Sequence, residues 1–381
     1  MRRLRLLLSV SLLGIVSPAV ASKGNTGAEF LKIGAGARPA ALGDTQAALA
    51  EGALAALWNP AALGGLSSAE ISLTHNRWFE GIQDQRFVAA VPTKSAGTVA
   101  LAYERLAIND FLSFDAQGTN TGAVNSGDSV ISLAWGRNLA QGATGGSGLY
   151  AGFAAKNINE KIAGVSASGF ALDFGFLFRP WGLTAQRLPW VRRSSLGFSA
   201  KNLGQGLKFD EENAPLPTEY NLGAGYSQPL GGDLLNLGLD YHLVTGETAA
   251  VSTGLEYWMK NLLALRLGYR TSDVDGLGFR AGAGFKVGKI QADYAWAATG
   301  NDFGPSHRIT LTYRFGPAAV APGLAADLFD DYVARGKRHI ELGLYDRAIL
   351  EFNEALSIHP GDESLRTLLL ECGQKMEKTA P

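Results

Sequence analysis

The sequence predicts an all-β transmembrane barrel of about 14 antiparallel strands, with an N-terminal plug in the lumen and a small α-helical appendage at the C-terminus. Three observations predict this fold. Residues 69–316 alternate apolar and polar side chains in one strand-length segment after another, glycines recur inside those segments, and the apolar period becomes helical after residue 317. The expected parts are a signal peptide at 1–21, the plug at 22–68, the barrel at 69–316, a linker at 317–324 and the helical tail at 325–381.

The first residues have the three-part pattern of a secretory signal. Arg2, Arg3 and Arg5 precede an apolar run over 6–16, and Ala19-Val20-Ala21 offers a small-residue cleavage site. The alternative is an uncleaved membrane anchor, but the apolar run is short for a membrane-spanning helix. We therefore expect an exported chain.

The bulk composition excludes some classes of protein. One cysteine in 381 residues rules out an internal disulfide framework, so an exported chain must be stable without one. A net charge of −1 argues against a nucleic-acid partner.

The middle of the chain alternates with a period of two. Leu265, Leu267 and Tyr269 alternate with Arg266 and Gly268, which places apolar and polar side chains on opposite faces of a strand. A soluble β-sandwich has the same alternation. Strands of about nine to eleven residues, the length that crosses a bilayer obliquely, favour the barrel. Aromatic residues near strand ends favour it as well.

Glycines inside the strands indicate a wall that another segment approaches closely. Such glycines weaken ordinary strands, but on a lumen wall they let a plug come near the backbone. The examples are Gly223, Gly225, Gly278, Gly282 and Gly284. Four acidic residues are expected on the same face, where they either line a pathway or hold the plug: Asp173, Asp240, Glu256 and Asp293.

The plug segment contains two capping signals. Asp44 is suited to cap a helix that continues to about Ala50, and Asn59 is a good N-cap with Pro60 at the first helical position. The Asn59-Pro60 step is therefore expected to be a corner between two short helices.

A family resemblance rests on two pieces of this segment. Residues 35–43, Ala-Gly-Ala-Arg-Pro-Ala-Ala-Leu-Gly, and residues 58–63, Trp-Asn-Pro-Ala-Ala-Leu, resemble the N-terminal signature of the PorV/PorQ family of FadL-like outer-membrane barrels. The resemblance implies about fourteen strands and a plug in the lumen. It makes Arg38, Trp58, Asn59 and Pro60 the plug motif. Family members often carry paired acids before the second piece, where this chain has Glu51-Gly52.

The tail is helical and resembles one tetratricopeptide repeat over residues 332–360. The matching positions are Tyr332, Gly336, Gly343, Tyr345, Ala348, Phe352, Ala355 and Pro360. A further helix over 362–378, with Leu365 and Cys372 on one face, would cap the repeat. A repeat of this kind either docks a periplasmic partner or only stabilises the chain.

No catalytic, metal or cofactor motif appears in the sequence. The five histidines are scattered without ligand spacing, and Cys372 lies on an apolar helix face, as a structural thiol does. The chain is therefore expected to be non-enzymatic and without a cofactor.

The expected location is the bacterial outer membrane, in contact with its lipid and with the tail in the periplasm. Resemblance to PorV implies the handling of exported protein cargo, as in type IX secretion, or of another protein partner in the envelope. The alternative, implied by the FadL-like barrels, is transport of a hydrophobic ligand through the barrel. A purely structural envelope scaffold is the third reading.

Overall fold

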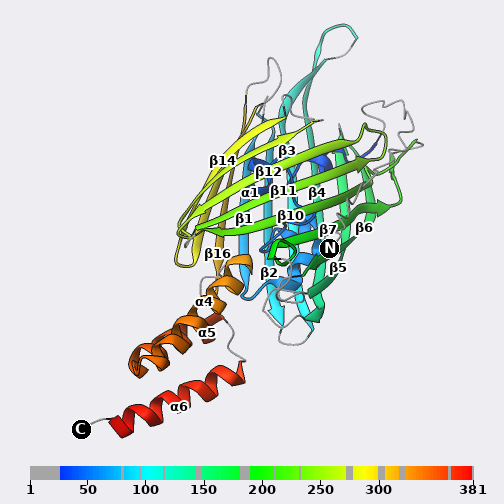
Figure 1. The fold of residues 1–381 in the computed structure, drawn as a ribbon. Coiled ribbons are helices and arrows are strands. Elements are labelled where there is room, and N and C mark those ends of the chain that lie inside the picture. Colours follow the sequence, from blue (N-terminus) through cyan, green and yellow to red (C-terminus); the bar gives the residue numbers. More distant parts are fainter. Residues whose placement is uncertain are drawn as a thin grey trace, which may run out of the picture.

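The body of the molecule is a closed antiparallel barrel (Figure 1). The computed structural model describes residues 26–78, 81–93, 96–114, 116–141, 148–162, 164–180, 189–209, 212–230, 233–271, 278–298, 305–316, 322–358 and 362–379. Within them, fourteen strands form one ladder that closes where β1 pairs with β16. The predicted fold class is confirmed. The expected signal peptide at 1–21 lies outside the described residues.

Each wall strand pairs with one other wall strand on either side. Wall strands that follow each other along the chain are adjacent around the barrel. The wall strands are β1 (Glu70–Arg77), β2 (Gln83–Thr93), β3 (Gly97–Phe114), β4 (Asn120–Gln141), β5 (Gly148–Ile162), β6 (Val165–Arg179), β7 (Ser194–Gly204), β10 (Glu219–Leu230), β11 (Asp233–Val244), β12 (Ala250–Met259), β13 (Leu263–Arg270), β14 (Phe279–Val287), β15 (Ile290–Ala297) and β16 (Ser306–Arg314). A separate hairpin of β8 (Leu207–Phe209) and β9 (Glu212–Ala214) interrupts the path from β7 to β10.

The two faces of the wall differ as the alternation predicts. On β13, Leu265 and Leu267 are 51% and 50% exposed on the outside, whereas Arg266 is 1% exposed in the lumen. The same pattern holds for apolar side chains on the other wall strands, so an apolar surface surrounds a polar interior. This is the arrangement of a barrel that faces lipid. Among the described residues, no helix is long and apolar enough to cross a membrane.

The barrel has two unlike ends. We call the end where β1 begins and β16 finishes the tail end, because the helical tail follows β16 there; the opposite end is the far end. At the tail end, β14 and β15 are joined through Gly288-Lys289 alone. At the far end the hairpin of β3 and β4 extends well beyond the other strands (Figure 1).

The N-terminal segment fills the lumen, as expected. It contains η1 (Glu29–Lys32), α1 (Ala37–Ala41), α2 (Ala55–Trp58) and η2 (Pro60–Gly65). It begins at the far end, where the Gly27 N–H donates to the carbonyl of Pro215 at 2.9 Å, and passes into β1 at the tail end.

One local expectation about the plug is wrong. Residues 45–50 form turns and not a helix, and Asp44 has a φ of 65°. The physical reason is competition from the wall. The carboxylate of Asp240 accepts the N–H groups of Gln46 at 2.6 Å and of Ala47 at 2.7 Å, so Asp44 does not cap them.

The glycines of the wall do meet the plug. A Cβ atom on Gly136 would lie 2.2 Å from the Pro60 carbonyl oxygen, and one on Gly175 would lie 2.1 Å from Asn59 Oδ1. These distances are far inside van der Waals contact, so no larger residue fits there without displacing the plug.

The glycines named from the sequence behave in two ways. Gly223, Gly225 and Gly282 face plug side chains at 2.5–2.8 Å from the position of a Cβ atom. Gly284 faces wall side chains instead, and Gly278 has a φ of 75° beside the Arg270 carbonyl at the start of β14. The close-approach explanation is confirmed for three of the five.

The helical tail contains α4 (Pro322–Glu341), α5 (Tyr345–Ile358) and α6 (Glu363–Thr379). Their core holds Ala348, Phe352, Ala355, Leu365 and Cys372, with Tyr332 and Tyr345 packed against it. Helix α4 begins within the stretch expected to be a linker.

The structure explains why two positions of the predicted repeat are glycines. A Cβ atom on Gly336 would lie 2.4 Å from the Phe352 ring, and Gly343 has a φ of 72° between α4 and α5. Pro360 lies outside the described residues.

We predict that Gly152→Val prevents stable packing of the plug. Its Cβ would lie 2.4 Å from the backbone of Pro60, and overpacking of this kind costs about 1–3 kcal/mol. The measurement is the free energy of unfolding of the refolded barrel in urea. Ala151→Val, one residue away on the outer face, is the control and should leave that free energy unchanged. Equal stability of the two variants would contradict the packing described here.

Candidate functional site

The plug is held to the wall at a buried cluster of charges around Arg38. The guanidinium donates to Glu256 through Nε at 2.8 Å and through Nη2 at 2.9 Å. Glu256 also accepts from Arg266 Nε at 2.6 Å and from Asn236 at 2.9 Å, and it is 0% exposed. Charge-assisted, two-point bonding of this kind is strong and sets geometry. Arg38, predicted as a plug-motif residue, therefore anchors α1 to β12 and β13.

Trp58 and Asn59 organise the corner that the sequence predicts. Trp58 Nε1 donates to the carbonyl of Ala35 at 2.8 Å, and its ring lies 4.9 Å from Lys201 Nζ. The Asn59 side chain accepts the Ala61 N–H at 3.2 Å, so it does cap η2. Its amide also donates to the carbonyl of Ala47 at 2.6 Å. Pro60 is the first residue of η2, as expected.

The four predicted lumen acids separate into two pairs. Asp240 and Glu256 bond the plug directly. Asp293 pairs with Arg266 at 2.8 Å, and Asp173 pairs with Lys156 at 2.7 Å, so both remain within the wall. The structure places all four in fixed contacts, two of them holding the plug.

Sequence reasoning missed two further ties between plug and wall. Asp44 pairs with Arg280 at 2.7 Å and with Arg270 at 3.3 Å. Burial by itself would raise the pKa of the Asp44 carboxyl, but the two guanidinium groups outweigh it and hold that pKa below its usual range. In the sequence, Asp44 is a single acidic residue, and its basic partners lie on strands more than 200 residues away. The spacing of residues along the chain does not reveal such a contact.

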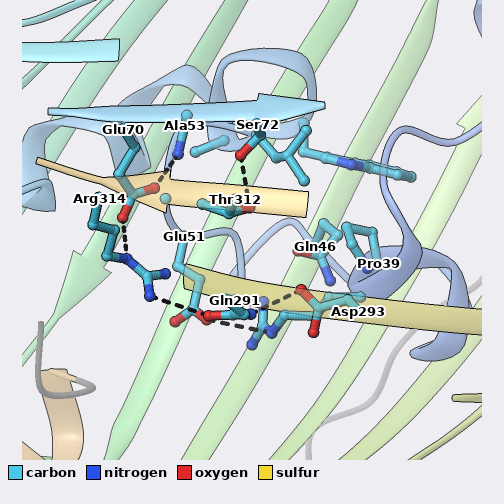
Figure 2. Close-up of a pocket in the computed structure, with 15 residues that line it drawn as sticks. Pro39, Gln46, Glu51, Ala53, Glu70, Ser72, Gln291, Asp293, Thr312 and Arg314 are labelled. Carbon is cyan, nitrogen blue, oxygen red and sulfur yellow. Dashed lines mark hydrogen bonds and ion pairs between the residues drawn. The ribbon is translucent and has the colours of Figure 1, made fainter. Parts of the chain in front are cut away.

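The second missed tie is Glu70, the first residue of β1. Its carboxylate accepts the Ala53 N–H at 2.9 Å and an Arg314 Nε–H at 2.5 Å (Figure 2). Ser72 and Thr312 bond each other beside it at 2.9 Å. The plug, the first strand and the last strand therefore meet at one carboxylate.

The cavities beside the plug are small. The one in Figure 2 measures about 30 Å³, and one beside Trp58 and Lys201 measures about 20 Å³. Each is large enough for roughly a single water molecule. The plug therefore leaves no wide aqueous passage beside these residues.

A serine–histidine contact in the wall packs the plug and does not form an accessible nucleophile. Ser252 Oγ lies 2.7 Å from His242 Nε2 and 3.2 Å from the plug residue Thr45. No motif in the sequence connects these residues. Both Ser252 and His242 are at most 2% exposed, so a substrate has no access to the hydroxyl. No cluster of three potential metal ligands occurs among the described residues.

The wall is interrupted between β6 and β7. Their pairing begins only at Ala171 with Gly204, so residues 165–170 of β6 pair with β5 alone among the described strands. A bulge follows directly, because pairing passes from Leu172–Leu203 to Phe174–Ala200. The chain leaves β7 at this point for the β8–β9 hairpin.

A buried polar cluster holds this bulge. Asn202 has a φ of 59°, and its N–H donates to Asp173 at 2.8 Å. Lys156 Nζ donates to the Asn202 side chain at 2.8 Å, and the Asn202 amide donates to the Pro217 carbonyl at 3.0 Å. The cluster therefore sets where the wall opens.

A groove on the outer face and an apolar cluster on the inner side flank the interruption, which we call the wall break. On the outer face, a groove of about 610 Å³ is lined by residues that include Ser168, Phe170, Leu172 and Leu203. On the inner side, an apolar cluster includes Phe30, Ile158, Leu207 and Leu216. Leu207 separates the two, because a Cβ atom on Gly169 would lie 2.7 Å from its Cδ2. Sequence analysis did not find this site; the run Gly204-Gln205-Gly206 was its one visible signal.

Comparisons with known proteins name no family for this chain. No family model matches it, and no curated protein matches it. Among solved structures it is similar to the toluene transporter TbuX of Ralstonia pickettii, with 13% identity and a TM-score of 0.48 over 74% of this chain and 99% of that chain.

Two further structures are similar at the same level. The toluene transporter TodX of Pseudomonas putida has 11% identity and a TM-score of 0.48, over 73% of this chain and 96% of that chain. A FadL homologue of Pseudomonas aeruginosa has 12% identity and a TM-score of 0.42, over 71% of this chain and 96% of that chain. Likeness at this level carries no argument about what the chain does. The PorV/PorQ resemblance and the tetratricopeptide interpretation stay predictions.

We predict that Glu256→Gln lowers the free energy of unfolding by about 3–5 kcal/mol, because it leaves two buried guanidinium groups short of a counter-charge. Urea unfolding of the barrel in phospholipid vesicles measures this. Glu247→Gln is the control, since its ion pair with Lys32 is partly exposed and is expected to contribute about 1 kcal/mol or less. A loss no larger than that of the control would contradict the anchoring role of Glu256.

Proposed function

We propose that this chain is a bacterial outer-membrane barrel that passes hydrophobic small molecules sideways into the bilayer. The observation that carries the proposal is the wall break between β6 and β7, with a groove of mixed polarity on its outer side and an apolar cluster on its inner side. A lipid-facing barrel gains nothing in stability from an unpaired strand edge, since each unsatisfied backbone group near hydrocarbon is costly. An interruption at this place is better explained by passage.

The filled lumen supports the sideways route. Arg38, Asp44 and Asn59 bind the plug to the wall or to itself, and two cavities beside it measure only about 30 and 20 Å³. An open pore for polar solutes would need a continuous wet channel, as porins have. An apolar ligand needs only the far-end half of the lumen and an exit through the wall.

The route begins at the far end. A ligand would enter beneath the β8–β9 hairpin and contact the apolar cluster around Phe30 and Ile158. It would then displace Leu207 and reach the outer groove beside Phe170. Burial of apolar surface at each stage stabilises the ligand by about 25 cal/mol per Å² relative to water.

We further propose that the far end is extracellular and that the tail is periplasmic. Outer-membrane barrels have short periplasmic turns and longer extracellular loops. Gly288-Lys289 is a short turn at the tail end, whereas β3 and β4 extend beyond the far end. In this orientation, ligands enter from outside the cell.

A protein partner is a second candidate role for the tail. Leu350 on α5 and Leu370 on α6 are 66% and 69% exposed, and exposed apolar side chains of this kind are covered when a partner protein binds. Exported cargo of the type IX kind is one such partner. It stays a prediction, because none of the described contacts favours it over other proteins.

We predict that Ser168→Trp blocks uptake. Ser168 lines the outer groove, so an indole there fills the exit, and uptake of labelled oleate and toluene should fall to that of cells without the barrel. The measurement is initial uptake rate in cells that lack other uptake barrels. Ser166→Trp, two residues away on the same exposed face but outside the groove, is the control and should retain uptake. Uptake equal in both variants would contradict the exit route.

We also predict that deletion of residues 322–381 leaves uptake unchanged, because the proposed route lies wholly in the barrel. Proteins that co-purify with the full chain and the shortened chain in mild detergent are compared by mass spectrometry. Exported proteins lost with the tail would support the partner role. If the deletion abolished uptake in a correctly inserted barrel, the route as drawn would be wrong.

A further inference from the structure

A second apolar groove lies on the outer wall near the tail end. It measures about 560 Å³, and its lining is almost wholly apolar, with Phe178, Trp190, Leu196, Ala224, Tyr226 and Leu239 among its residues. Short helix α3 (Pro189–Arg192) forms one side of it. It shares β6 and β7 with the exit groove at Ser168 but lies at the opposite end of those strands, and it extends to β10 and β11.

The groove exists because one outward residue is small. In the register of the sheet, Ala224 of β10 lies between Leu196 of β7 and Leu239 of β11. Along β10 its outward neighbours are Leu222 and Tyr226. A methyl group surrounded by large side chains leaves a trough in an otherwise filled apolar surface.

Trp190 turns the trough into a groove. Its side chain is 61% exposed, and the helix that carries it is held by the Ser194 hydroxyl, which donates to the Trp190 carbonyl at 2.8 Å. Indole rings prefer the level of lipid headgroups, because one edge is polar and the rest is apolar. The groove therefore begins at headgroup level and runs along the apolar wall.

A cation marks the headgroup end. The Arg193 carbonyl accepts the Ser227 N–H at 2.9 Å, which fixes Arg193 against β10. Its Nη1 donates to Gln228 Oε1 at 2.6 Å, and the Tyr226 hydroxyl donates to the same oxygen at 2.9 Å. A guanidinium, an amide and a phenol thus lie together beside the apolar groove.

Asp233, an acidic residue of the adjoining strand β11, is hydrogen-bonded within the wall. Asp233, at the start of β11, accepts the Tyr257 hydroxyl at 2.5 Å and the Lys260 N–H at 2.9 Å. Arg193 supplies a guanidinium beside the groove, and guanidinium groups bind phosphate through charge-assisted hydrogen bonds.

We infer that this groove binds one glycerophospholipid with an anionic headgroup, its acyl chain over Ala224 and its phosphate at Arg193. The inference rests on the proposed placement in a membrane but not on the transport of ligands. A negative result in the lipid-binding test would therefore leave the uptake predictions standing, and a negative result in the uptake test would leave the lipid site standing.

The test uses the delipidated full chain and phosphatidylglycerol, with bound lipid counted by native mass spectrometry. We expect one tightly retained lipid in the wild type. Ala224→Phe fills the groove and should abolish that retained lipid. Ala283→Phe, the same change on the outer face of β14, is the control and should retain it. Equal retention in both variants would overturn the acyl-chain site.

The headgroup is tested separately. Arg193→Gln should weaken phosphatidylglycerol binding by about tenfold or more, as expected for loss of one charge-assisted bond. Arg193→Lys should largely restore it, and phosphatidylcholine, whose headgroup has no net charge, should bind more weakly to the wild type. Equal binding of the two lipids, together with no effect of Arg193→Gln, would overturn the anionic preference.

Discussion

The bidentate bond between Arg38 and Glu256 is the contact on which the rest of this structure depends. The barrel of fourteen strands encloses a lumen where buried charged residues lie beside apolar ones, and each buried charge needs a partner there. The N-terminal segment meets that lumen with small residues and a few charged ones. Glu256 accepts hydrogen bonds from plug and wall at the same time, so the segment is part of the barrel and not a loose insert. The fixed position of the plug also explains wall glycines such as Gly136 and Gly175, because a Cβ atom at either position would clash with the plug.

A filled lumen makes the wall itself the place where function has to be sought. Several strand junctions contain a bulge or a strand that extends past its neighbour, as residues 108–114 of β3 extend past β2. The junction of β6 and β7 combines an unpaired strand start with a bulge, because residues 165–170 of β6 pair with no described strand on the β7 side. Asp173, Lys156 and Asn202 stabilise that bulge with buried hydrogen bonds, so the interruption is built into the fold.

Much of the fold could be predicted from the sequence because barrel strands repeat one simple pattern. Alternation at positions such as Leu265 and Arg266 follows from lipid on one side and a polar lumen on the other. The Asn59-Pro60 corner was also readable, since capping and proline geometry act within a few residues. Arg38 was named from a family resemblance, but its partner was not, because Glu256 lies far along the chain.

The functional site was less predictable for a related reason. The wall break is a failure of pairing, and pairing depends on register between strands, which a single sequence does not display. Asparagine adopts the left-handed conformation more readily than most residues, but no motif in the sequence selects Asn202 for it. Asp44 was misread as a helix cap because Asp240, from another strand, takes the N–H groups that a cap would bind. In each case a long-range contact overrides a local preference.

Photo-crosslinking tests the central claim most directly. The full chain in outer-membrane vesicles is incubated with a fatty acid that carries a photoreactive group at its end, irradiated, and the labelled residues are mapped by mass spectrometry. The account predicts labels at Leu207 and on the groove residues Phe170 and Leu203. Labels concentrated instead at the tail-end cavity beside Glu70 and Arg314 would mean that ligand passes along the plug, and would contradict a sideways exit.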